Sequence, residues 1–185
     1  MVLTLIICTI VADFITGIVH WFEDTYGMPT WPLGIGKHVI LPNIEHHENP
    51  TKITMSGILL RNYQTATMGI IFALIVWYFF EWYIAWPICV TVLVAGLFGN
   101  EVHTWNHTPR SKLPKWIIFL QDTCILQTRK QHAIHHKKPY DKYYCTLTNV
   151  TNVVLELIGF WRKLEWCLAK CGLQVKRGTV DRRGF

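Results

Sequence analysis

The segment Arg129–Pro139, RKQHAIHHKKP, contains three histidines at helical spacing. His132, His135 and His136 stand at positions i, i+3 and i+4, so a helix would place their rings on one face. Imidazole is a common ligand of iron and zinc, and three rings on one face can converge on an ion. The flanking arginine and lysines indicate water or a membrane surface around this segment rather than hydrocarbon. A solvated basic helix with incidental histidines is the simpler alternative.

Histidines recur upstream at two further places with ligand-like spacing. His46 and His47 are adjacent in IEHHENP, and His103 and His107 share a helical face in GNEVHTWNHTPR. Either pair alone is a weak indication of metal, because many such pairs bind nothing. His38 has no partner at ligand spacing, and we interpret it as a surface residue.

A polar stripe runs along the apolar N-terminal segment. Asp13, Gly17, His20 and Asp24 recur at helical intervals, so they share one face of an otherwise hydrophobic rod. A carboxylate inside a membrane helix is costly and usually faces a site or a partner. A position in the headgroup layer is a reasonable alternative for Asp24 but a poor one for Asp13.

The composition indicates an integral membrane protein. Hydrophobic residues make up 51% of the 185 residues, charged residues make up 16%, and there are nine tryptophans. The net charge of +6 fits basic loops that face anionic lipid on the cytosolic side better than nucleic-acid binding, because the cations form no stripe interleaved with aromatic residues. The six cysteines show no framework spacing and are interpreted as reduced thiols.

We therefore predict an all-α membrane bundle that forms a single domain over residues 1–185. Tyr26–Arg61, with its prolines and glycines, is expected to be loop-like, and the region from residue 128 to the end is expected on the cytosolic side, with a basic, mobile tail KRGTVDRRGF. The expected elements are membrane helices at about 1–21, 65–81 and 85–105, of which the last two form a hairpin, and an interfacial helix at about 113–127.

This topology brings the histidines together. If the hairpin turn lies outside and the basic loops lie inside, eight of the nine histidines meet at the inner face of the membrane. Eight imidazoles exceed the four ligands of one zinc and suit two iron ions with positions open for dioxygen. The predicted metal ligands are His20, His46, His47, His103, His107, His132, His135 and His136.

Other polar residues receive supporting roles in this hypothesis. Four are expected to orient the ligands or to act as occasional ligands themselves: Asp13, Asp24, Asn100 and Glu101. Four cations could bind the phosphate of a lipid headgroup or simply face the bilayer surface: Arg61, Arg110, Arg129 and Lys130. No side chain beyond the metal ligands is expected to act as acid or base on the reacting carbon.

Five blocks in order resemble the Kua-type, or CarF-type, membrane lipid desaturases. The blocks are ADFITGIVHWFEDTYG, EHHENPTKIT, NEVHTWNHT, LQDTCILQTRKQHAIHHKKP and YYCTLTNVTNVVLELIGFWRKLE, and they cover about residues 13–166. This family includes plasmanylethanolamine desaturase and a plastid phosphatidylglycerol desaturase, and the animal branch is the nearer match.

The resemblance implies an eight-histidine diiron site, dioxygen as co-substrate and a membrane phospholipid as substrate. It also implies electrons from an external donor, such as cytochrome b5 with its reductase or a ferredoxin-like protein. For the animal branch, it implies a vinyl-ether double bond in the alkyl-ether chain of an ethanolamine phospholipid, made at the endoplasmic reticulum.

The chain departs from the family pattern at three points. Gln131 stands where another histidine is expected beside His132, and Asn149–Asn152 replaces the expected Gly-Trp-Leu-Asn. The resemblance also implies a preceding membrane helix, for which this sequence shows no counterpart.

Three alternatives remain open at this level. The same site could desaturate or hydroxylate a phospholipid acyl chain. A metal transporter would need ionisable residues near mid-membrane on several helices, whereas Thr65–Phe80 and Ala85–Gly99 contain none. A non-catalytic membrane anchor with a structural zinc would bind a single zinc rather than two irons.

Overall fold

The computed structural model describes residues 2–177, and all its regular elements in that range are helical. The all-α prediction is therefore confirmed. The elements, in chain order, are α1 (Val2–Tyr26), a π-helical turn η1 (Gly36–Ile40), α2 (Leu41–Glu48), a 3₁₀ turn η2 (Pro50–Met55), α3 (Ile58–Phe79), α4 (Trp82–His107), a 3₁₀ turn η3 (Arg110–Lys112), α5 (Lys115–Asp122), α6 (Arg129–His135), α7 (Asn149–Leu157) and α8 (Phe160–Lys170).

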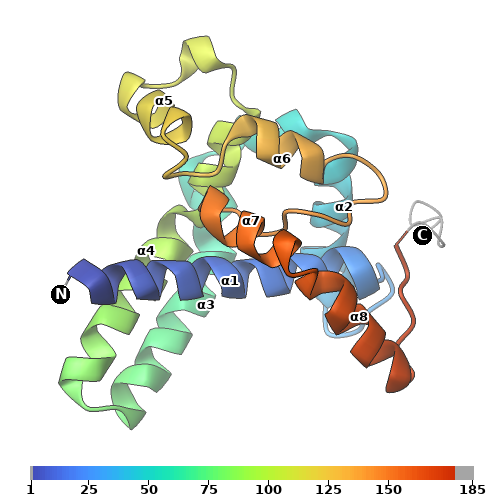
Figure 1. Cartoon of the computed structure of the whole chain (residues 1–185), viewed down its shortest axis with the longest axis horizontal. Coiled ribbons are helices and arrows are strands. Elements are labelled where there is room, and N and C mark those ends of the chain that lie inside the picture. Colours follow the sequence, from blue (N-terminus) through green and yellow to red (C-terminus); the bar gives the residue numbers. More distant parts are fainter. Residues whose placement is uncertain (1, 178–185) are drawn as a thin grey trace.

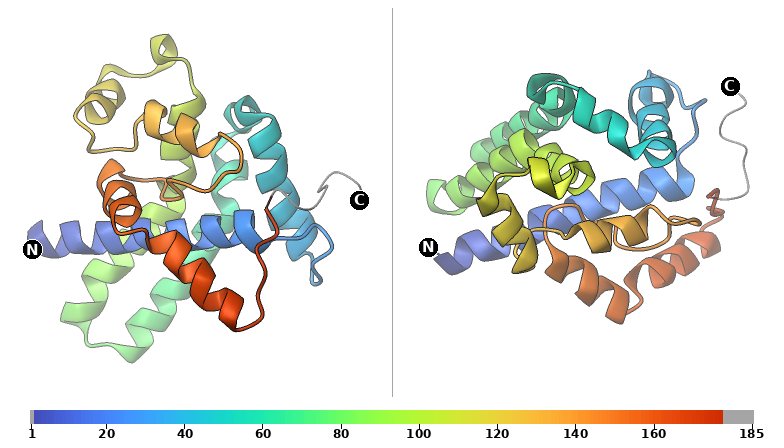
Figure 2. Two further views of the ribbon diagram at one scale, coloured as in Figure 1. Left: turned by 45° about the vertical axis from the view of Figure 1, so that its right-hand side comes forward. Right: turned by 90° about the horizontal axis from the view of Figure 1, so that it is seen from above.

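Within residues 2–177, three helices are long and apolar enough to cross a membrane: α1, α3 and α4. Figure 1 shows α3 and α4 as a hairpin, with α1 crossing it, α2, α5, α6 and α7 gathered beyond the crossing, and α8 extending to the other side of α1. The turn of the hairpin lies at one end of the molecule, and the C-terminal end of α4 lies among α2, α5 and α6 at the other (Figures 1 and 2).

The first helix has its polar face inward and its apolar face outward. Asp13, Gly17, His20 and Asp24 are all buried, as the stripe predicts. Aliphatic residues such as Ile7 on the opposite face are exposed. An exposed apolar surface that covers buried polar residues is the arrangement expected of a helix in contact with lipid.

Small residues allow α3 and α4 to approach closely. A Cβ atom added to Gly96 would lie 2.7 Å from the backbone oxygen of Thr65, whose hydroxyl donates a hydrogen bond of 2.8 Å to the Gly96 carbonyl. Nearer the turn, Cys89 Sγ donates to the Ala73 carbonyl at 3.3 Å. Between membrane helices, such close packing and inter-helical hydrogen bonds replace the hydrophobic effect as the source of association.

At the other end of the hairpin, a buried ion pair joins the two helices. Arg61 on α3 donates to both carboxylate oxygens of Glu101 on α4, with Nη2–Oε2 at 2.8 Å. Asn62 donates to the same carboxylate at 2.8 Å, and Asn100 donates to the Arg61 carbonyl. These contacts fix the register of α4 just before its two histidines.

Two segments differ from the sequence prediction. The region from Tyr26 to Arg61 was expected to be loop-like but contains η1, α2 and η2. Pro42 and Pro50 lie in the first turns of α2 and η2, where a missing N–H costs nothing, so these prolines begin helices instead of breaking them. The helix expected at 113–127 is shorter, because Pro114 caps α5 and the helix ends at Asp122.

We predict that Gly96→Ala destabilises the hairpin by about 1–3 kcal/mol, the usual cost of overpacking. The added methyl group would meet the backbone of Thr65, which cannot move aside as a flexible side chain would. Thermal unfolding of the purified protein in detergent measures this. Leu97→Ala, at an exposed position of the same helix, is the control and should leave the melting temperature nearly unchanged.

Candidate metal centre

Four helices supply the eight predicted histidine ligands. His20 lies on α1, the adjacent His46 and His47 on α2, and His103 and His107 on the last turns of α4. α6 supplies the remaining three: His132, His135 and, directly after its last residue, His136. The structure brings all eight together, in two neighbouring groups, and leaves the exposed His38 outside them.

The short helix α6 is positioned by its cap and by buried amides. The Thr128 hydroxyl accepts a hydrogen bond of 3.2 Å from the Gln131 backbone N–H, which caps the helix. Gln127 is fully buried and donates to the Cys145 carbonyl at 2.8 Å, while its side-chain oxygen accepts from Asn106 at 2.8 Å. These bonds tie the start of α6 to the end of α4.

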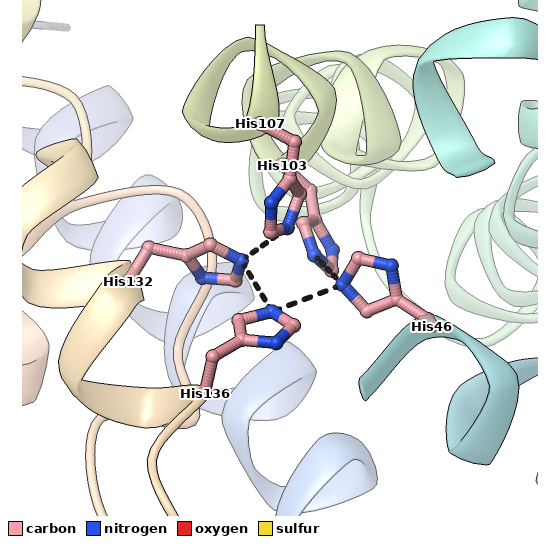
Figure 3. A group of neighbouring side chains, drawn as sticks. All are labelled: His46, His103, His107, His132 and His136. Atoms are coloured by element: carbon pink, nitrogen blue, oxygen red, sulfur yellow. Dashed lines mark hydrogen bonds between the residues drawn. The ribbon is translucent and has the colours of Figure 1, made fainter. Parts of the chain in front are cut away.

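Five imidazoles form the larger group, shown in Figure 3. Their Nε2 atoms form a chain of short contacts: His103 to His46 at 2.7 Å, His46 to His136 at 3.1 Å, His136 to His132 at 3.0 Å, and His132 to His107 at 2.7 Å. We call these residues the five-histidine group.

Hydrogen bonding alone cannot satisfy this chain of contacts. A neutral imidazole nitrogen carries either one hydrogen or one lone pair, yet three of these nitrogens each contact two others. The spacing is instead that of ligands around an ion. With metal–nitrogen bonds of about 2.0–2.1 Å, neighbouring ligand atoms of a four- to six-coordinate ion lie about 2.9–3.4 Å apart. The five nitrogens therefore fit a metal site.

The second group contains a carboxylate. It comprises His20, Asp24, His47 and His135, all buried. Asp24 Oδ1 lies 3.1 Å from His47 Nε2, and Oδ2 lies 3.7 Å from His20 Nε2 and 3.6 Å from His135 Nε2. Asn43 donates to Asp24 Oδ1 at 2.7 Å and so orients the carboxylate. We call these four residues the histidine–aspartate group.

Backbone carbonyls fix the tautomers of two histidines in this group. His20 Nδ1 lies 3.1 Å from the Tyr144 carbonyl oxygen, and His135 Nδ1 lies 2.9 Å from the Lys142 carbonyl oxygen. A carbonyl only accepts hydrogen bonds, so each Nδ1 must carry the hydrogen and each Nε2 must present its lone pair to the group. Metal-bound histidines commonly have such partners.

Burial keeps the imidazoles outside the membrane-spanning helices neutral. Burial, with a smaller contribution from neighbouring histidines, lowers the pKa of His136 to about 3. Burial also lowers the pKa values of His46, His132 and His135, again with a smaller contribution from adjacent rings. A neutral ring retains the lone pair that a metal needs, so the environment favours coordination at neutral pH.

Asp13 and Asp24 on α1 were both predicted to orient a ligand or to act as one, and their partners differ. Asp24, for which the headgroup layer was a reasonable alternative, lies within the histidine–aspartate group. Asp13 was expected to orient a histidine, but its oxygens accept from the backbone of Leu147 at 2.8 Å and from the backbone and hydroxyl of Thr148 at 3.1 and 2.6 Å. Asp13 thus anchors the segment that precedes α7.

Asn100 and Glu101 also hold the fold rather than the ligands. Their hydrogen bonds go to α3, as described above, although both lie within one turn of His103. The same ion pair removes Arg61 from the predicted headgroup cations, because its side chain is only 14% exposed and bound to Glu101.

The other predicted headgroup cations remain at the surface. Arg110 pairs with Asp122 at 2.6 Å, and Arg129 donates to the Thr108 carbonyl at 2.5 Å. Lys130 is exposed and borders a shallow depression lined by Cys124, Gln131 and Tyr143. Their role toward lipid stays a prediction.

The residues at which the chain departs from the family pattern are hydrogen-bonded to one another. Gln131 accepts from Asn152 at 2.8 Å and donates to the Asn149 carbonyl at 3.2 Å, so it joins α6 to α7. Sequence reasoning missed Asn43 and the carbonyls of Lys142 and Tyr144 as groups that orient ligands. Carbonyls carry no residue signature, and Asn43 lies in a segment that was expected to be a loop.

Apolar outer surfaces around eight inward-facing histidines define a helical membrane protein with a histidine-rich site suited to metal. The chain belongs to the lipid desaturase domain family, whose profile matches residues 9–177. It is 38% identical over 167 residues to mouse plasmanylethanolamine desaturase 1, covering 84% of this chain and 60% of that protein.

Other relatives lie in bacteria and viruses. Plasmanylethanolamine desaturase of Myxococcus xanthus is 32% identical over 83% of this chain and 55% of its own length. A probable fatty acid desaturase of Acanthamoeba polyphaga mimivirus is 32% identical over 84% of this chain and 76% of its own length. The chain therefore spans little more than half of both plasmanylethanolamine desaturases. No solved structure matches it.

We predict that the purified protein binds two metal ions and that each group holds one. His135→Ala, in the histidine–aspartate group, and His136→Ala, in the five-histidine group, should each lower the metal content toward one ion per chain. Plasma mass spectrometry measures the content. Full occupancy in either variant would remove that residue from its site, and His38→Ala is the control.

Asp13 and Asp24 should respond differently to replacement by asparagine. Asp24→Asn should weaken metal binding by about 10–100-fold, whether the carboxylate is a ligand or orients one. Asp13→Asn replaces an acceptor of three hydrogen bonds, so it should lower the melting temperature of the metal-free protein more than Asp24→Asn does. The reverse ranking in both assays would show that the structural assignment is wrong.

Proposed function

We propose that this chain is a membrane lipid desaturase that forms a vinyl-ether double bond in the alkyl-ether chain of an ethanolamine phospholipid. The observation that carries the proposal is the pair of histidine-rich groups at one end of the apolar helices. Membership of the lipid desaturase family and identity to plasmanylethanolamine desaturases from mouse and Myxococcus support the choice of reaction.

Two iron ions fit this donor set better than one zinc, because nine potential ligands lie in two groups. When bound, they would supply the activation of dioxygen. The reaction removes one hydrogen from each of two adjacent methylenes, and dioxygen takes up these hydrogens, two electrons and two protons to give two waters. The electrons come from an external donor, for which cytochrome b5 with its reductase or a ferredoxin-like protein is proposed.

The contribution of the protein side chains is positioning and exclusion of water. Imidazoles held neutral by burial present their lone pairs, and the carbonyls of Lys142 and Tyr144 keep two of them in the right tautomer. Pairing with Arg61 lets the carboxylate of Glu101 lie within one turn of His103 without adding net charge beside the site. No acid or base on the reacting carbon is required from the side chains, because the bound metals would supply the activation of dioxygen that removes the hydrogens.

A second candidate is desaturation of a fatty-acyl chain in the same class of phospholipid. Chloroplastic fatty acid desaturase 4 of Arabidopsis thaliana, at 31% identity over 84% of this chain, favours it. The same metal centre would serve both reactions, and the choice depends on which carbons reach it.

Lipid analysis distinguishes these functions. Cells that lack vinyl-ether lipids are given an alkyl-ether precursor and made to express the chain or its His103→Ala variant. We expect vinyl-ether ethanolamine lipids with the chain and none with the variant. A new acyl double bond without a vinyl ether would support the second candidate, and neither product, together with one bound zinc, would support a structural role.

We further propose that the metal centre faces the cytosol, in the endoplasmic reticulum of a eukaryotic host. Asn106 and Asn149 both lie in glycosylation sequons, Asn-His-Thr and Asn-Val-Thr. Asn106 is buried and bonded to Gln121 and Gln127, so a glycan there is incompatible with the fold.

Neither sequon should therefore be modified on expression in such a host. A sequon engineered into the Glu81–Trp86 turn, at the opposite end of the hairpin, should be modified if it clears the membrane surface. Peptide mass spectrometry reads both outcomes. A glycan on Asn149 would place the metal centre on the lumenal side.

A further inference from the structure

The last described residues return to α1 and bind there. The Lys176 backbone N–H donates to the Thr25 carbonyl at 2.8 Å, near the end of α1. The tail KRGTVDRRGF was expected to be mobile, but its first two residues, Lys176 and Arg177, are held in place, and residues 178–185 lie outside the described range. The segment 173–177 thus forms a strap from α8 back to α1.

Arg177 is the centre of the contacts of this strap. Its guanidinium donates to the Thr25 hydroxyl at 2.7 Å, to the Tyr144 hydroxyl at 3.0 Å and to Glu165 Oε2 at 2.8 Å. The side chains of Arg177 and Glu165 are only 11% and 12% exposed. A buried ion pair is tolerated where its hydrogen bonds are well satisfied, as they are here.

The hydrogen bonds around Arg177 and Glu165 make a second contact with α1. The other oxygen of Glu165 accepts a hydrogen bond of 3.0 Å from the Trp21 indole N–H. One arginine therefore links three parts of the chain: the end of α1, helix α8, and Tyr144 in the segment after α6.

Tyr144 carries this link to the histidine–aspartate group. It is fully buried, and its ring centroid lies 6.1 Å from that of His20 and 5.5 Å from that of His135. Its carbonyl accepts from His20 Nδ1 at 3.1 Å. Arg177 thus holds the hydroxyl end of the residue whose backbone orients a predicted ligand.

We propose that Arg177 is a positioning residue for the histidine–aspartate group and acts through Tyr144. The inference rests on the proposed function, because it presumes that this group holds a metal. The side-chain hydrogen bonds of Arg177 go to Thr25, Tyr144 and Glu165 and none of these residues belongs to the five-histidine group, so its effect should be confined to one of two ions. Loss of a contact that orients a ligand weakens metal binding by about 10–100-fold.

The test uses the full chain with Arg177→Gln, loaded with iron(II) without oxygen. The control is Arg162→Gln, which removes an exposed arginine of α8 that pairs with Glu156. Both proteins are challenged with increasing chelator, and the iron retained is measured by plasma mass spectrometry. We expect one ion of Arg177→Gln to be lost at about 10–100-fold lower chelator activity and the other to behave as in wild type. The control should match wild type throughout.

The alternatives give distinct results. If wild type binds no metal, the proposed function fails as well. If wild type binds two ions and Arg177→Gln retains both with wild-type affinity, or loses both equally, only the positioning role is overturned.

A second variant covers the case in which Arg177→Gln does not fold. Tyr144→Phe keeps the ring and the carbonyl but removes the hydroxyl that accepts from Arg177 and donates to the Tyr140 carbonyl. Selective weakening of one ion supports the proposal, and unchanged binding of both contradicts it.

Discussion

The convergence of imidazole nitrogens is the constraint on which the rest of the structure depends. Five Nε2 atoms in contacts of 2.7–3.1 Å cannot all be satisfied by one another's hydrogens. Burying them in this arrangement is unfavourable unless an ion takes their lone pairs. Helices from distant parts of the chain are nevertheless held around this point by specific hydrogen bonds. Thr128 caps α6, and the side-chain amide of Gln127 donates to the Cys145 carbonyl.

A protein in contact with lipid can expose its apolar residues and use its interior for polar ones. The apolar residues of α1 are exposed, and its polar residues face inward toward the other helices. The interior can therefore be filled with polar side chains whose hydrogen bonds are satisfied by neighbouring groups, as in the Asp13 contacts with Leu147 and Thr148. Polar bonding, rather than a large aliphatic core, positions the site, and the main apolar cluster lies beside it around Trp21 and Trp161.

Periodicity and composition were sufficient to predict the helical class, the hairpin, the inward stripe of α1 and the convergence of eight histidines. They could not divide those histidines into two groups, because the division depends on how α2 and α6 are rotated. They also could not separate Asp13 from Asp24, since both lie on the same helical stripe. Only the tertiary partners distinguish them: two backbone N–H groups donate to Asp13, whereas three imidazoles lie near Asp24.

Two pairs of consecutive histidines, His46–His47 and His135–His136, limit how far the two groups can separate. His46 and His135 lie in different groups from their neighbours His47 and His136. Each pair therefore bridges both groups through a single peptide unit, whose length is set by covalent bonds. Consecutive Cα atoms are about 3.8 Å apart, so neither group can move away from the other by more than side-chain rotation allows. The covalent geometry of the backbone thus limits the distance between the two groups. Side-chain packing elsewhere in the molecule can change without changing this limit.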